Sequence, residues 1–382
     1  MLNWINFLHI YQPPNQDPKI LKQVTNESYL HIIGLLKKYP HLKITLNISG
    51  TLLEQFDHNG YKKVIDEIKK LIKKGKIELV GSAMNHPILP LLPKNEIKRQ
   101  IGLHNEISRE RFGKSYKPTG FFIPEMAYSK KVADVIHEMG FKWIILDEIH
   151  FPEKEIDTNI KYKIKNNGLN VIFRDRTFSK SFPPESIVNS LDDIKTKHII
   201  TAHDGEVYGH WHKEDYGYYK KAFTHKGIKN ILASEYLKKL KKTKEITPRD
   251  ANWESTDAEL KNKIPYAFWD DPKNKIHQKL WDLRELAITS INKNENDPNF
   301  FWARNHLDNG LASCTWWWAA ERQPDVFSPI TWNPTEIEKG LKELINSIRS
   351  LEKLNPKTKL KAEKIYISLT KAIWQKHWKK YI

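Results

Sequence analysis

The chain has 382 residues, of which 39% are hydrophobic and 29% charged, a composition typical of a folded protein that excludes a disordered one. Its formal net charge of +17 suggests a nucleic-acid partner, but only 10 of the 63 basic residues are Arg, the residue that nucleic-acid sites favour. We therefore expect solvated Lys faces and no nucleic-acid partner. No apolar run approaches about 18 residues, so no membrane span is expected.

Seven short apolar runs predict strands, and amphipathic patterns between the first five predict helices. The strand runs are residues 4–10, 42–48, 77–80, 119–123, 142–146, 170–173 and 198–202, and the helical patterns are residues 20–38, 61–74, 95–112 and 130–139. Each strand followed by a helix implies a parallel crossover, so the fold class is α/β. Seven parallel strands with helices outside them suggest a barrel close to the eight-stranded type.

From about residue 216 the strand pattern fades and helical patterns dominate. These patterns cover residues 229–241, 274–292, 299–319, 333–351 and 361–381. We therefore expect two domains, a catalytic barrel over residues 1–215 and an α-helical C-terminal domain over residues 216–382, packed on the mouth of the barrel.

The cysteine content and the N-terminal sequence indicate the cellular compartment. The single cysteine, Cys314, cannot form an internal disulfide, and the opening sequence MLNWINFLHI lacks the basic segment of a signal peptide. Both features favour a cytoplasmic location.

Two of the predicted strands lead directly into an isolated carboxylate. The run at 119–123 ends at Pro124 and is followed by Glu125, and the run at 198–202 is followed by His203 and Asp204. Side chains just past the C-terminal ends of barrel strands face the active site. A pair of carboxyl groups at one mouth suggests cleavage of a glycosidic bond, whereas a solvated Glu or a helix cap is the alternative for Glu125 alone.

The polar-aromatic cluster at residues 203–211, HDGEVYGHW, has a second interpretation as a metal site. Its candidate ligands are His203, Asp204, His210 and the following His212. Their spacing fits no standard zinc motif, so we favour a structural or substrate role and expect no metal.

Four segments, in order along the chain, resemble the motifs of glycoside hydrolase family 57. They are HIYQP at 9–13, GSAMNHPILPLL at 81–92, GFFIPEMAYS at 120–129 and HDGEVYGHW at 203–211. The family has a second His in the first motif, where this chain has Tyr11. The fifth family motif has no clear counterpart, and residues 252–255 and 308–318 are the candidates.

This resemblance implies an incomplete seven-stranded (β/α)7 TIM-like barrel followed by a helical domain, with no metal and no cofactor. It also implies a retaining enzyme that acts on α-linked glucans through a covalent glycosyl-enzyme, with Glu125 as nucleophile and Asp204 as general acid/base. Amylase, 4-α-glucanotransferase and branching activities all stay open. A metal-dependent carbohydrate deacetylase on a related barrel and a catalytically silent carbohydrate-binding homologue are the alternatives.

Further residues are candidates for substrate binding. The sequence does not indicate an oligomeric state. Sugar hydroxyls accept and donate hydrogen bonds, and an aromatic ring covers the apolar face of a sugar. The expected polar contacts are His9, Gln12, His86, Glu206 and His210, and the expected aromatic platforms are Trp211 and Trp253. Histidines whose hydrogen bonds are satisfied inside the protein are the alternative for each His. The carboxyl oxygens of the two catalytic candidates are expected to lie within about 4–7 Å of each other.

Overall fold

The computed structural model describes residues 1–324, 330–379 and 382. The chain forms two compact units, each made of several segments. The first comprises Met1–Gln12, Gln16–Met84 and Leu89–Trp253, and the second comprises Pro13–Asn15, Asn85–Ile88 and Glu254–Ile382.

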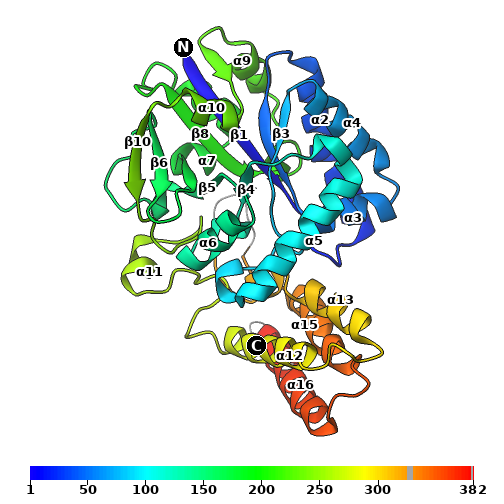
Figure 1. Ribbon diagram of the computed structural model, residues 1–382. Coiled ribbons are helices and arrows are strands. Elements are labelled where there is room, and N and C mark those ends of the chain that lie inside the picture. The colour runs from blue at the N-terminus through cyan, green and yellow to red at the C-terminus, as the bar shows by residue number, and fades with distance from the viewer. Residues whose placement is uncertain (325–329, 380–381) are drawn as a thin grey trace. The chain divides into compact units, whose positions relative to one another are not determined.

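The first unit is α/β and is built on two sheets (Figure 1). One sheet has the order β3 (Ile77–Leu79), β2 (Ile44–Ile48), β1 (Leu2–Ile10) and β8 (His198–Asp204), with β9 (Ile228–Asn230) also paired to β1. The other has the order β10 (Lys242–Ile246), β6 (Ile160–Ile164), β7 (Asn170–Arg174), β5 (Trp143–Asp147) and β4 (Gly120–Phe122). All pairs are parallel except β6 with β7.

Short hydrogen-bonded links connect the two sheets. The Gly81 N–H donates to the Gly120 carbonyl and the Phe122 N–H donates to the Gly81 carbonyl, both at 2.9 Å, beside the ends of β3 and β4. The Asp175 N–H donates to the Ile200 carbonyl at 2.8 Å, which joins the end of β7 to β8. Backbone hydrogen bonds therefore join the two sheets at two places.

Helices surround these strands in the first unit. They are α1 (Pro18–Val24), α2 (Leu30–Lys38), α3 (Gly50–His58), α4 (Lys62–Lys73), α5 (Lys94–Phe112), α6 (Lys130–Glu138), α7 (Arg176–Ser179), α8 (Pro183–Asn189), α9 (Tyr218–Thr224) and α10 (Ala233–Lys239). A π-helical turn, Thr25–Tyr29, joins α1 to α2, and 3₁₀ turns cover Leu89–Leu91, Gly113–Ser115, Pro124–Met126, Glu148–His150 and Gly205–Val207. β1 is buried on both faces, although it carries the polar residues Asn6 and His9.

The second unit is helical. Its helices are α11 (Asp257–Lys261), α12 (Lys275–Asn292), α13 (Phe300–Gly310), α14 (Cys314–Trp317), α15 (Pro334–Arg349) and α16 (Pro356–Trp378). Fully buried side chains such as Leu280, Leu307, Trp316 and Leu341 pack α12, α13, α14 and α15 together.

All seven strands predicted from apolar runs are present, and three strands were missed. β6 and β10 escaped the prediction because their sequences, IKYKI and KTKEI, alternate Lys with other residues and bury few side chains. The helical pattern at 229–241 was wrong at its start, where β9 pairs with β1 before α10 begins. Residue 381, the expected end of the last helix, lies outside the described residues.

The division between the units falls after Trp253, later than the domain boundary expected at residue 215. Residues 216–253 contain β9 and β10, whose hydrogen bonds run to β1 and β6 of the first unit. Strand pairing therefore holds this segment in the first unit although its sequence reads mainly as helical.

Close packing at Gly120 predicts a stability effect. A Cβ atom at this position would lie 2.1 Å from the Trp143 ring, so Gly120→Ala should lower the free energy of unfolding by about 1–3 kcal/mol. Urea unfolding measures the change. Gly102→Ala in α5 is the matched control, because nothing lies within 4 Å of its Cβ, and it should be neutral or stabilising by up to about 1 kcal/mol. Equal effects of the two substitutions would contradict the packing argument.

Candidate functional site

Glu125 lies on a strained turn directly after β4. Pro124 begins this turn, and the next two residues have left-handed backbones, with φ of +58° at Glu125 and +48° at Met126. Such conformations cost about 1–3 kcal/mol each in non-glycine residues and gather at functional sites. Glu125 is partly exposed although Pro124 and Met126 are both buried, so its side chain leaves the core here.

Residues 251–253, the last of the first unit, lie along this turn. The Trp253 indole N–H donates to Oε2 of Glu125 at 2.9 Å, and the Trp253 backbone N–H donates to the Glu125 carbonyl at 3.2 Å. The Tyr128 N–H donates to the Ala251 carbonyl at 2.9 Å. Residues 251–253 thus fix both the backbone and the carboxylate of Glu125.

Asp204 is the last residue of β8 and pairs in register with His9 of β1. Like Glu125, it is partly exposed between buried neighbours, His203 and Gly205. A Cβ atom at position 205 would lie 2.5 Å from Cγ2 of Ile10. Only glycine therefore allows the chain to turn away from the end of β8 this close to β1.

His9 lies next to Asp204 in the sheet and next to Trp253, which neighbours Glu125. Its ring stacks on Phe122 of β4 with centroids 4.5 Å apart and meets Trp253 edge-on at 6.3 Å. Asp204 is the strand neighbour of His9, and Trp253 holds Glu125. The structure therefore brings both predicted catalytic residues to the same group of strand ends. The separation of about 4–7 Å between their carboxyl oxygens stays a prediction.

His9 is buried and uncharged at neutral pH. Its Nδ1 lies 2.6 Å from Oδ1 of Asn47, its register partner in β2. Burial lowers the pKa of His9 to about 4, although the bond to Asn47 opposes this. With Nδ1 donating to the Asn47 oxygen, the neutral ring presents Nε2 as an acceptor, which suits a sugar hydroxyl.

Glu206 and Gln12, predicted as sugar contacts, hydrogen-bond to each other. Glu206 is only 4% exposed, and its Oε1 accepts from the Tyr29 hydroxyl at 2.5 Å and from Nε2 of Gln12 at 3.2 Å. Burial raises the pKa of Glu206 to about 6. Burial, with the charges of Glu206 and Asp204, raises the pKa of the Tyr29 hydroxyl well above its ordinary value. This buried network lies close enough to Asp204 for the charge of Asp204 to act on Tyr29.

His210 and Trp211 follow the 3₁₀ turn after β8. His210 Nδ1 lies 2.6 Å from Oε2 of Glu27, and this hydrogen bond lowers the pKa of Glu27. Trp211 is 44% exposed, whereas Trp253, the other expected platform, is 7% exposed. Of the two rings, Trp211 offers more surface to a ligand.

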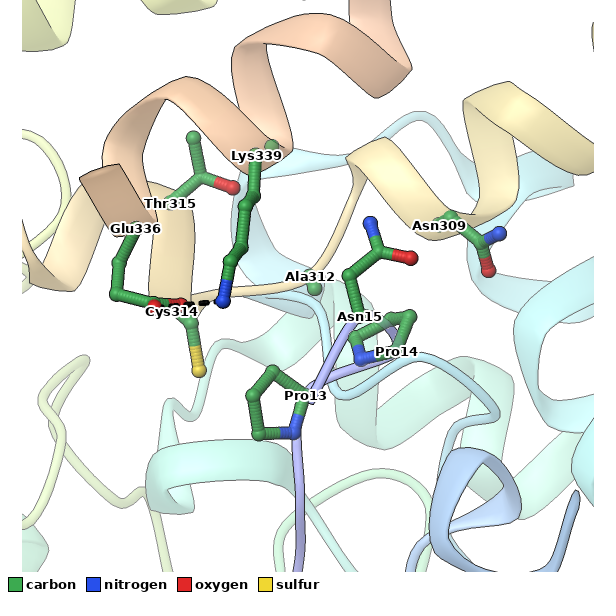
Figure 2. Close-up of a pocket in the computed structure, with 10 residues that line it drawn as sticks. Pro13, Pro14, Asn15, Asn309, Ala312, Cys314, Thr315, Glu336 and Lys339 are labelled. Carbon is green, nitrogen blue, oxygen red and sulfur yellow. Dashed lines mark hydrogen bonds and ion pairs between the residues drawn. The ribbon is translucent and has the colours of Figure 1, made fainter. Parts of the chain in front are cut away.

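His86 belongs to the second unit. Its backbone is left-handed at φ +55°, its carbonyl accepts from the Ser313 N–H at 3.2 Å, and its Nδ1 lies 3.0 Å from the Ser313 hydroxyl oxygen. Figure 2 shows a small hollow in the same unit, where Lys339 pairs with Glu336 at 2.7 Å. The residues that line it are Pro13, Pro14, Asn15, Asn309, Ala312, Cys314, Thr315, Glu336, Lys339 and Gly340.

Sequence reasoning missed the buried ion pair Asp147–Arg174. Asp147 is fully buried and accepts from Nε of Arg174 at 2.7 Å and from Nη1 of Arg176 at 3.1 Å. Burial opposes its ionisation, but the two Arg charges still hold the pKa of Asp147 below its ordinary value. Both partners end strands, β5 and β7, so the strand-end rule that selected Glu125 would have found them.

Within 1–324, 330–379 and 382, no group of three or more His, Cys, Asp or Glu side chains is placed to hold a metal ion, which is the arrangement that the deacetylase alternative requires. In the same ranges, no helix has the length and apolar character needed to cross a membrane.

The family model described as glycosyl hydrolase family 57 matches residues 3–249. The chain belongs to this family. An α-amylase from Pyrococcus horikoshii is 28% identical over 261 residues, which cover 63% of this chain and 41% of that protein. A 4-α-glucanotransferase from Thermococcus litoralis is 22% identical over 248 residues, covering 62% of this chain and 37% of that protein. The chain thus spans about two fifths of the length of the curated relatives it matches.

Solved structures share the fold of this family 57 chain. The 4-α-glucanotransferase from Thermococcus litoralis superposes with a TM-score of 0.72 at 18% identity, over 92% of this chain and 60% of that one. An α-amylase from Thermotoga maritima gives 0.69 at 14% identity, over 96% of both chains. A branching enzyme from Pyrococcus horikoshii gives 0.68 at 14% identity, over 96% of this chain and 94% of that one.

The raised pKa of Glu206 predicts a pH effect on stability. Because its folded-state pKa of about 6 exceeds the ordinary 4.5, the stability it contributes is complete below about pH 4.5 and is lost as the pH rises through about 6. The loss is about 2 kcal/mol. Glu206→Gln stays neutral, so its unfolding free energy relative to the native protein should rise by about that amount between pH 4 and pH 8.

Urea unfolding at both pH values measures this difference. Glu27→Gln is the control, because a hydrogen bond from His210 lowers the pKa of Glu27 and its stabilisation is lost on acidification instead. A pH-independent difference for Glu206→Gln would rule out the raised pKa.

Proposed function

We propose that this family 57 chain is a retaining glycoside hydrolase or transglycosylase acting on α-linked glucans. Glu125 is the nucleophile and Asp204 the general acid/base. The observation that carries the proposal is the convergence of both carboxylates on His9, one through β-strand register and the other through Trp253. The relatives named α-amylase and 4-α-glucanotransferase support the substrate class.

The reaction follows from the two roles. The Glu125 carboxylate attacks the anomeric carbon and forms a glycosyl ester, while Asp204 gives its proton to the departing glycosidic oxygen. Asp204 then takes a proton from water or from a sugar hydroxyl. The oxygen of that acceptor attacks the anomeric carbon opposite Glu125, on the face that the leaving group left, and displaces the Glu125 carboxylate. Neutral His9 contributes a hydrogen bond to a sugar hydroxyl without adding charge between the carboxylates. Retention requires the carboxyl groups to lie about 5–5.5 Å apart.

The architecture we propose is an incomplete seven-stranded barrel of β1, β2, β3, β4, β5, β7 and β8. The Gly81–Phe122 and Asp175–Ile200 hydrogen bonds support it, because they link the two sheets beside β3 and β4 and between the end of β7 and β8. Catalysis is assigned to the first unit, and an accessory substrate-binding role, including that of His86, to the helical second unit. A cytoplasmic location and the lack of a nucleic-acid partner stay predictions.

The products from maltooligosaccharides decide the acceptor. Hydrolysis yields only shorter chains, transfer also yields longer ones, and branching yields new α-1,6 points. A chain that binds these sugars without any turnover would be the silent carbohydrate-binding homologue. Deacetylation of an acetylated sugar that depends on added metal would favour the deacetylase.

Substituting the two carboxylates should separate their roles. Glu125→Gln should abolish turnover, because an amide forms no glycosyl ester. Asp204→Asn should lower kcat on maltooligosaccharides by about 100- to 10,000-fold but spare the first step on an aryl glycoside, whose leaving group needs no proton. Stopped-flow release of the aryl group measures that step. Full activity in both variants would refute the proposal.

Rescue by azide should then reveal which residue is the nucleophile. In Asp204→Asn, azide attacks the glycosyl-enzyme, so the glycosyl azide keeps the substrate's configuration. In Glu125→Gly, azide replaces the nucleophile directly, so the product is inverted. NMR of the product distinguishes the two outcomes, and swapped stereochemistry would reverse the assigned roles.

A further inference from the structure

We propose that Trp253 is a positioning residue that, anchored by Arg174 and Asp147, fixes the orientation of the Glu125 carboxylate for attack. This inference rests on the proposed function, since it requires Glu125 to be the nucleophile. It differs from the sequence-based expectation that Trp253 is a platform for a sugar ring.

The first step is the double attachment of Glu125 to a single residue. Trp253 donates its indole N–H to Oε2 of Glu125 at 2.9 Å and its backbone N–H to the Glu125 carbonyl at 3.2 Å. A charge-assisted hydrogen bond to one carboxylate oxygen restrains the rotation of the carboxylate. The backbone bond restrains a residue whose φ of +58° is unfavourable by itself.

The second step is the anchor of the indole itself. The Arg174 guanidinium lies over the Trp253 ring, 5.0 Å from its centroid. Arg174 cannot swing away easily, because its Nε bonds to Asp147 at 2.7 Å and its Nη1 donates to the Ala202 carbonyl at 2.6 Å. The indole therefore rests on a side chain that joins the ends of β5, β7 and β8.

The segment after β5 also contacts Met126, the second left-handed residue of the turn. The buried ring of His150 lies between the carbonyl oxygens of Asp147, at 2.8 Å, and Met126, at 2.9 Å. Burial lowers the pKa of His150 despite the nearby Asp147 charge. Two separate contacts thus run from the Asp147 region to the turn that carries Glu125.

Burial separates this role from that of a sugar platform. Trp253 is 7% exposed, with Arg174 over its ring and His9 and Phe122 as further aromatic neighbours. A sugar platform requires an open ring face, which Trp211 offers at 44% exposure. The charged or titratable groups facing Trp253 are Glu125, Arg174 and His9, and His9 is neutral above pH 4 or so.

Trp253→Phe tests the proposal, because it keeps an aromatic ring and removes the N–H donor. We expect kcat to fall about 10- to 100-fold with KM changed less than about twofold, since the lost bond orients the nucleophile rather than the substrate. The acid limb of the kcat/KM profile should move to higher pH, because the ionised carboxylate loses a donor. A purely structural role would not move that limb.

Replacing Trp253 with 3-benzothienylalanine gives a second variant that preserves the ring shape and lacks only the N–H. It should reproduce the fall in kcat even if the Phe variant folds poorly. Trp143→Phe is the matched control, because Trp143 is also buried and donates its indole N–H to Thr119 at 3.2 Å, at the opposite end of β5. Its kcat and pH profile should match those of the native protein.

The outcomes distinguish this inference from the proposed function. A raised KM with unchanged kcat in both Trp253 variants would overturn positioning and restore the sugar platform. Unchanged kcat and KM would also overturn it, and the proposed function would stand if Glu125→Gln were inactive in the same assay. If Glu125→Gln were fully active, the proposed function itself would fail.

Discussion

The parallel pairing of β1 with β8 is the constraint on which the rest of the first unit depends. It joins segments about 195 residues apart and sets Asp204 beside His9. β1 also pairs with β2 and β9, so one buried strand fixes the register of three others. A slip of one residue would turn His9 and Asp204 to the opposite face. It would also break the buried hydrogen bond that the Trp4 indole N–H of β1 donates to the Thr201 hydroxyl of β8.

Burial controls the protonation of the groups around the two carboxylates. Desolvation keeps His9 and His203 neutral, with pKa values of about 4, and raises the pKa of Glu206 to about 6. Burial also opposes the ionisation of Asp147, but the charges of Arg174 and a second Arg, with the Ile149 N–H, hold its pKa below the ordinary value.

The backbone strain at Glu125 is compensated by contacts from distant parts of the chain. Glu125 and Met126 adopt left-handed conformations. The Trp253 N–H donates to the Glu125 carbonyl, and Nε2 of His150 lies 2.9 Å from the Met126 carbonyl oxygen. Such a turn is stable only when its surroundings over-determine it. A rigid nucleophile turn needs little reorganisation during the reaction, which is how a preorganised site lowers a barrier.

The sequence by itself determined the seven apolar strands and the two strand-end carboxylates, because continuous apolar runs and abrupt polar ends are local signals. It also carried the family motifs around Glu125 and Asp204. Only the tertiary structure decided that residues 216–253 join the first unit, because the pairing of Lys-rich β10 with β6 depends on a distant partner. It alone decided that Glu206 is enclosed and that Trp253 is bonded to Glu125, because burial and contact between distant segments leave no periodic trace in the chain.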